Sequence, residues 1–183
     1  MNKRFFLYVI AVFLLVLGCA TTEHLSNFAD DMHRGDQQLK RGQYPTALAS
    51  FLKANTYHPS AGALAFAAMA AYKMNDIPLA DSYLVQAHGQ NADQVVTCII
   101  LGYWSLVRFN QGDEIGGIKS LSEYLAAYKS LVPGSASMPD VELMATSGRI
   151  DINRLQQTID RQIQELPIDF DRMGEDAGLR GGR

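Results

Sequence analysis

The chain has 183 residues, 48% of them hydrophobic, with 16 Lys and Arg against 19 Asp and Glu and a net charge of −3. This length fits one domain, and the apolar content is enough for a packed core. The mildly acidic balance, without a basic cluster, argues against nucleic acid and against attraction to anionic lipid headgroups.

Residues 1–18 have the organisation of a secretory signal peptide. Lys3 and Arg4 form a basic start, thirteen apolar residues follow from Phe5 to Leu17, and Gly18 precedes Cys19. A helix needs about 20 residues to cross a hydrocarbon core of ~30 Å, so this run is too short to span a membrane. A basic start, a short apolar run and a small residue before the cut predict a cleaved signal.

The end of this segment, Val16-Leu17-Gly18-Cys19, resembles the lipobox of bacterial lipoproteins. The resemblance implies cleavage before Cys19 and attachment of fatty acids such as palmitate to its sulfur and new amino group. In such lipoproteins, an aspartate directly after the cysteine retains the protein at the inner membrane. Ala20 occupies this position, so the resemblance implies an anchor in the outer membrane, with the protein facing the periplasm. The alternative is an uncleaved anchor, or an ordinary signal peptide with a chance cysteine.

Loss of residues 1–18 removes two basic residues and leaves 14 against 19 acidic ones, a net charge of −5. Residues 19–27 then form a short lipidated tether, and residues 169–183, rich in glycine and charge, are expected to be a disordered tail. The carboxylates near the ends of the domain, Asp30, Asp31, Asp169 and Asp171, are expected to be solvated.

Between residues 28 and 128, small residues recur at intervals of 33 and then 37 residues. The columns are Gly35, Ala68 and Ser105; Ala47, Ala80 and Gly117; and Ala54, Ala87 and Tyr124. Eight of these nine residues are small, and Tyr124 replaces a small residue in the third copy. The same shifts align Gly42, Asn75 and Gly112, and also Phe51, Leu84 and Leu121. Small side chains at fixed positions allow two helices to approach closely, so the spacing predicts repeated helix pairs.

The first copy carries a resemblance to the tetratricopeptide repeat, a helix–turn–helix unit. Gly42 and Tyr44 mark its turn, Ala47 and Phe51 line its second helix, and Pro59 ends it. The resemblance implies an all-α solenoid of about three repeats. The early tryptophan of the family is missing, and the second helix of the third copy is expected to be longer. A non-repeat helical bundle is the alternative.

Residues 129–168 predict further helices after Pro133-Gly134. Ser137, Pro139 and Asp140 form one helix start, and Asp151 is placed to cap another. Ile152, Leu155, Ile159, Ile163 and Leu166 form an apolar stripe opposite Arg154, Gln157, Asp160, Arg161, Gln164 and Glu165. We expect this amphipathic helix to cap the repeats, with partner binding or dimerisation as the alternative.

Nothing in the sequence predicts catalysis, a metal or a cofactor. The four histidines are scattered, and no glycine-rich phosphate loop follows a strand. Cys98 has the apolar neighbours Ile99, Ile100 and Leu101, which favours a buried thiol over a nucleophile.

In the tetratricopeptide family, the first helices of the repeats line a concave groove that holds partners. Carried onto this sequence, the groove positions are Met32, Leu39, Ala65, Met69, Tyr72, Gly102, Leu106 and Phe109. These side chains are apolar and suit adaptable hydrophobic binding. Alternatively they are core, covered by the C-terminal helix.

The resemblances together imply a non-catalytic lipoprotein adaptor that binds another envelope protein, for instance in assembly, secretion or pilus machinery. A lipoprotein subunit that regulates an envelope enzyme, and a carrier of a small apolar ligand, are the alternatives.

Overall fold

The computed structural model describes residues 26–173, which contain helices and turns but no strand. The helices are residues 26–40, α2 Tyr44–Tyr57, α3 Ala61–Lys73, α4 Ile77–His88, α5 Gln94–Asn110, α6 Glu114–Leu131, α7 Met138–Ser147 and α8 Ile152–Glu165, and residues 170–173 form a last helical turn. The all-α prediction is confirmed for this part of the chain. Residues 1–18, Cys19 and most of the expected tether lie outside the described residues.

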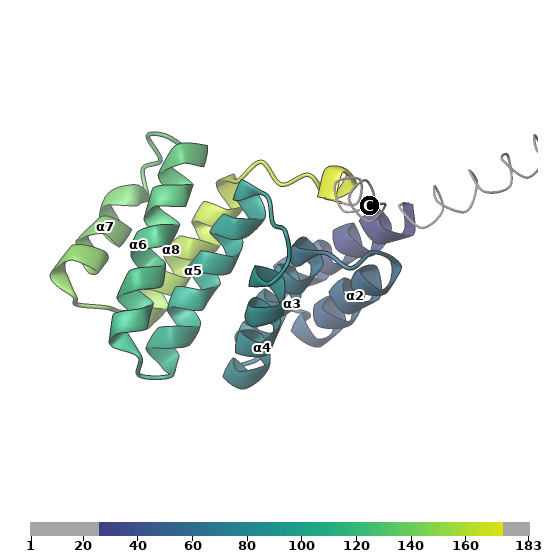
Figure 1. The fold of residues 1–183 in the computed structure, drawn as a ribbon, viewed down its shortest axis with the longest axis horizontal. Coiled ribbons are helices and arrows are strands. Elements are labelled where there is room, and N and C mark those ends of the chain that lie inside the picture. Colours follow the sequence, from purple (N-terminus) through teal and green to yellow (C-terminus); the bar gives the residue numbers. More distant parts are fainter. Residues whose placement is uncertain (1–25, 174–183) are drawn as a thin grey trace, which may run out of the picture.

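The helices pack as successive neighbours along the chain. Figure 1 shows them side by side in chain order, from the helix at residues 26–40 to α7, with α8 returning behind α5 and α6. The closest associations join α2 to α3, α3 to α4, and α5 to α6. This repeated pairing buries an apolar surface that no single helix pair could cover by itself.

Three turns share one backbone geometry, and they lie at the positions that the sequence spacing aligned. Gly42, Asn75 and Gly112 have φ angles of 73°, 62° and 76°, in the left-handed region. Each donates the same backbone hydrogen bond: Gly42 N donates to Leu39 O, Asn75 N to Tyr72 O and Gly112 N to Phe109 O. Glycine, and asparagine less easily, adopts this conformation at a helix end. The predicted repeat spacing of the turns is therefore confirmed.

The small residues of the repeated columns lie at helix–helix contacts. Ala47 and Ala80 are fully buried. A Cβ added to Gly117 would lie 2.5 Å from the Phe109 ring, and one added to Gly35 would lie 2.5 Å from the Phe51 ring. These distances are too short for any side chain larger than hydrogen without a shift of the ring. Close approach between paired helices thus depends on these positions.

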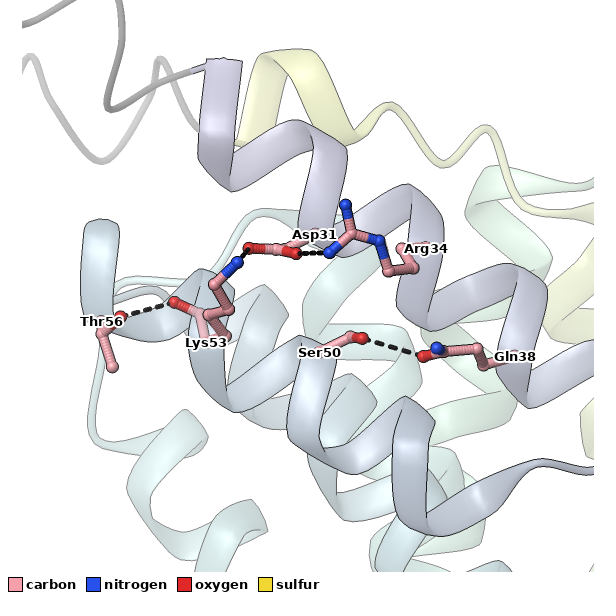
Figure 2. A network of polar contacts seen from close by, with 6 residues as sticks. All are labelled: Asp31, Arg34, Gln38, Ser50, Lys53 and Thr56. Atoms are coloured by element: carbon pink, nitrogen blue, oxygen red, sulfur yellow. Dashed lines mark hydrogen bonds and ion pairs between the residues drawn. The ribbon is translucent and has the colours of Figure 1, made fainter.

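Asp31 corrects one expectation from the sequence, because it is buried and not solvated. Its exposed fraction is 2%, and its carboxylate accepts from Arg34 at 2.6 Å and pairs with Lys53 of α2 at 3.0 Å. The pair raises the pKa of Lys53, mainly through the hydrogen bond to Asp31. Figure 2 shows this contact beside a second one, in which Ser50 donates to Gln38. Polar contacts therefore join the first helix to α2.

The predicted starts of the two C-terminal helices are confirmed. Ser137 precedes α7, although it makes no side-chain cap to the helix, and its hydroxyl contacts Ser135. Asp151 caps α8 by accepting from Arg154 N at 3.0 Å. The second helix of the third copy, α6, is also longer than α2 and α4, with 18 residues against 14 and 12.

The expected tail begins later than predicted. Residues 170–173 are helical, and Phe170 and Met173 are 6% and 8% exposed, because their side chains pack against the first helices. Residues 174–183 lie outside the described residues. We call residues 166–173 the strap, and Figure 1 shows it running from the end of α8 to the helix at residues 26–40.

Candidate functional site

The eight predicted groove residues are buried or half-buried, and they do not form one open surface. Three of them, Met32, Ala65 and Leu106, are completely inaccessible. Phe109 packs toward α6, because its ring fills the space that a Cβ on Gly117 would need. Tyr72 stacks edge-on against Tyr103, with ring centres 5.5 Å apart.

The helix with the apolar stripe, α8, covers Gly102. A Cβ added to Gly102 would lie 3.2 Å from Ile159 and 3.0 Å from Tyr124. α8 packs against α5 and α7, while α7 packs against α6. Helix α8, which we expected to cap the array, therefore covers part of the face formed by the first helices of the repeats. Helix α7 covers α6.

The remaining two residues, Leu39 and Met69, line an open cleft with a volume of about 710 Å³. Its walls come from the helix at residues 26–40, the start of α2, α3, α8 and the strap. The apolar lining is completed by Phe66, Ile163, Leu166, Ile168 and Phe170. The polar lining consists of His33, Asp36, Lys40, Tyr44, Lys73, Asp160 and Gln164. A cleft of this size with a mixed lining is typical of a binding site.

The charges in the cleft pair with one another. Lys40 contacts Asp36 at 2.7 Å, and Lys73 of α3 forms an ion pair with Asp160 of α8. Asp160 also accepts a hydrogen bond of 2.5 Å from the Tyr103 hydroxyl. The cleft therefore presents no large excess of either charge, so it favours an apolar ligand over a strongly charged one.

Burial keeps the tyrosines beneath α8 protonated. The pKa of Tyr103 is raised well above its usual value, first by burial and then by the charge of Asp160. Burial likewise raises the pKa of Tyr124, whose hydroxyl donates to Gln162 at 2.7 Å. Tyr128 donates to Glu165 at 2.5 Å, and its pKa is raised mainly by burial. These hydroxyls hold α8 in place as neutral donors.

Sequence reasoning missed the polar docking contacts of α8. It placed Asp160 and Glu165 on the polar, outward face of an amphipathic helix, whereas both side chains reach protein partners. The periodicity of a helix distinguishes apolar from polar faces, but it cannot show that a tyrosine or lysine on another helix lies within reach. No signal in the sequence pairs Asp160 with Lys73, 87 residues away.

Cys98 is fully buried, as its apolar neighbours predicted. Burial raises the pKa of its thiol to about 12, which leaves almost no thiolate at neutral pH. Within residues 26–173, no group of three or more His, Cys, Asp or Glu side chains is placed to hold a metal ion.

No helix among residues 26–173 combines the length and the apolar character that a membrane span requires. The lipidation residue predicted from the sequence, Cys19, lies outside the described residues. In comparisons with known proteins, the sequence matches no protein-family profile and no curated protein.

Proposed function

We propose that this chain is a non-catalytic adaptor, anchored in the bacterial cell envelope through acylated Cys19, which binds a protein partner in the cleft. The observation that carries the proposal is the cleft itself, which is lined by half-buried Leu39, by Met69, which is buried, and by the strap. Methionine and leucine side chains adapt to varied apolar partners.

The helix pairs support a tetratricopeptide-like array of about three repeats, closed at the end by α7 and α8. The three equivalent left-handed turns and the buried small columns favour this arrangement. In such an array the first helices of the repeats form the binding face. The cleft lies on the first helices of the first two proposed repeats, residues 26–40 and α3.

Membrane attachment is tested by metabolic labelling with a fatty-acid analogue. We expect Cys19→Ser to abolish labelling, because the acylated sulfur is lost, and to leave the precursor unprocessed or released. Cys98→Ser is the matched control, because its thiol is buried within the domain. Labelling of the Cys19→Ser variant at the level of the parent would refute the lipid anchor.

Partner binding is tested by crosslinking in intact cells, followed by purification in mild detergent. We expect Leu39→Glu, which places a charge on the wall of the cleft, to abolish the crosslinked partner while the helical circular dichroism persists. Leu143→Glu on α7 is the matched control, because Leu143 is 66% exposed and away from the cleft. A partner retained by Leu39→Glu, or lost equally from both variants, would contradict a role for the cleft.

A carrier of a small apolar ligand is the second candidate, favoured by the volume of the cleft, about 710 Å³. Native mass spectrometry of the protein purified from membranes distinguishes the two. A bound small molecule that is absent from the Leu39→Glu variant would support the carrier, and a partner chain would support the adaptor.

A further inference from the structure

The strap places apolar side chains against the protein and polar ones outward. Leu166, Phe170 and Met173 are each at most 8% exposed, and Ile168 is half-buried. The residues between them, Pro167, Asp169, Asp171 and Arg172, are exposed. The spacing of the inward residues is thus two, two and three positions.

The inward side chains fill places on the first-helix face beside the cleft. The Phe170 ring lies edge-on to His33, with ring centres 5.1 Å apart, and to Phe66, with centres 5.3 Å apart. A Cβ added to Gly62 would lie 3.0 Å from the Met173 sulfur, so the absence of a side chain there makes room for Met173. Leu166, Ile168 and Phe170 also line the open cleft. The surface that the strap covers is therefore continuous with the surface of the cleft.

The strap carries its own backbone structure. Ile168 N donates to Leu166 O at 2.8 Å, which closes a three-residue turn around Pro167. Met173 N donates to Asp169 O at 3.1 Å, and the Asp169 carboxylate caps Arg172 N at the same distance. These hydrogen bonds lie within the strap, whereas Asp160, Gln162 and Glu165 of α8 bond to side chains of α3, α5 and α6.

We propose that the strap occupies part of the partner-binding surface that is continuous with the cleft. A partner displaces the strap with a segment that has the same spacing of apolar side chains. The proposal rests on the adaptor function and specifies the chemistry of the partner: a short segment with large apolar side chains at the spacing of Leu166, Ile168, Phe170 and Met173. A partner that enters the cleft meets the strap, because Ile168 and Phe170 form one wall. Lys40 and Lys73 each form an ion pair with an aspartate of the cleft, so their charges do not favour a charged ligand.

The test uses the full chain in detergent and a fluorescent synthetic peptide with the sequence of residues 165–173. Phe170→Ser removes the ring from His33 and Phe66, and should release the strap. Asp171→Ser changes the exposed neighbour and is the matched control. We expect the peptide to bind Phe170→Ser at least tenfold more tightly than it binds the parent or the control. A peptide with serine in place of its Ile and Phe should not compete.

Hydrogen exchange of residues 166–173 reports whether the strap is released. Met173→Ser removes the other buried side chain that anchors the strap, and it serves as a second variant if Phe170→Ser unfolds. Released strap with no gain in peptide binding would overturn the proposal, as would a strap that stays protected in both variants. Dimers of the parent that exchange straps would show that the groove takes a second copy and would overturn its assignment to a separate partner.

A negative result in the peptide test can be distinguished from a negative result in the crosslinking test. Loss of the crosslinked partner in Leu39→Glu, together with no peptide binding by Phe170→Ser, would keep the adaptor and reject the displaceable strap. Peptide binding without any crosslinked partner would support the groove as a binding surface and refute the adaptor function in the cell.

Discussion

Gly112 gives the sharpest test of the repeated turns, because its φ angle of 76° lies in the left-handed region that favours glycine. A Cβ added to Gly112 meets no atom within 4 Å, so Gly112→Ala creates no clash and only imposes the left-handed conformation on an alanine. That conformation costs an L-residue about 1–2 kcal/mol. The lower entropy of the unfolded alanine chain offsets about 0.4–1 kcal/mol. We therefore expect a net loss of about 1 kcal/mol in the free energy of unfolding.

The assay is thermal unfolding of the chain without residues 1–19, followed by circular dichroism. A loss of about 1 kcal/mol should lower the melting temperature by about 2–4 °C in a domain of this size. Gly89→Ala is the matched control, since Gly89 ends α4 with a φ of −71° and an added Cβ there has only ordinary contacts at 3.6 Å. We expect it to leave the melting temperature unchanged or slightly raised.

Asn75 should respond in the opposite direction, because it occupies the equivalent turn with a φ of 62° and has a Cβ. Asn75→Gly relieves that strain, so we expect a small rise in melting temperature. If Gly112→Ala melted at or above the temperature of the parent while Gly89→Ala behaved as expected, the turn would not be left-handed. The equivalence of the three turns would then be wrong.

Three further predictions concern packing, a buried carboxylate and pH. Ala80→Leu adds bulk at a fully buried helix contact and should cost about 1–3 kcal/mol, seen as a lower melting temperature; unchanged melting would contradict the predicted register. Asp31→Ala should destabilise the domain by about 1–3 kcal/mol in denaturant unfolding, whereas Asp30→Ala, at an exposed position, should change stability little. Burial lowers the pKa of His58 below its usual 6.5, so the unfolded chain binds its proton more readily and stability should fall as pH drops below about 6.5. His58→Asn should flatten this slope in melting curves between pH 5 and 7, and an unchanged slope would exclude His58 as its source.

The sequence predicted the local features of the fold because local physics specifies them. The positions of Gly42, Asn75 and Gly112 followed from the spacing, since a left-handed helix end restricts the residue type at one position. Asp151 was recognised as a cap for the same reason, because its bond spans only three residues. The buried side chains Leu155, Ile159 and Ile163 followed from helical periodicity.

The candidate site was only partly predictable. Two of the residues at the family's groove positions, Leu39 and Met69, line the cleft, whereas Met32 and Leu106 are inaccessible. Residues 169–173 of the strap were expected to be part of the tail, because two apolar residues among charges and glycines give no periodic signal. Burial of Phe170 depends on His33 and Phe66, which are more than 100 positions earlier in the sequence.

The sequence by itself thus determined which segments are helices, where their turns lie and which face of each helix is apolar. Only the tertiary structure decided that α8 lies over Gly102, that Asp160 meets Lys73 and Tyr103, and that the strap borders the cleft. An apolar stripe has nearly the same free energy of burial against any complementary surface, because the hydrophobic effect is non-directional. The choice among surfaces depends on shape and on hydrogen-bond partners that come together only when distant helices have packed.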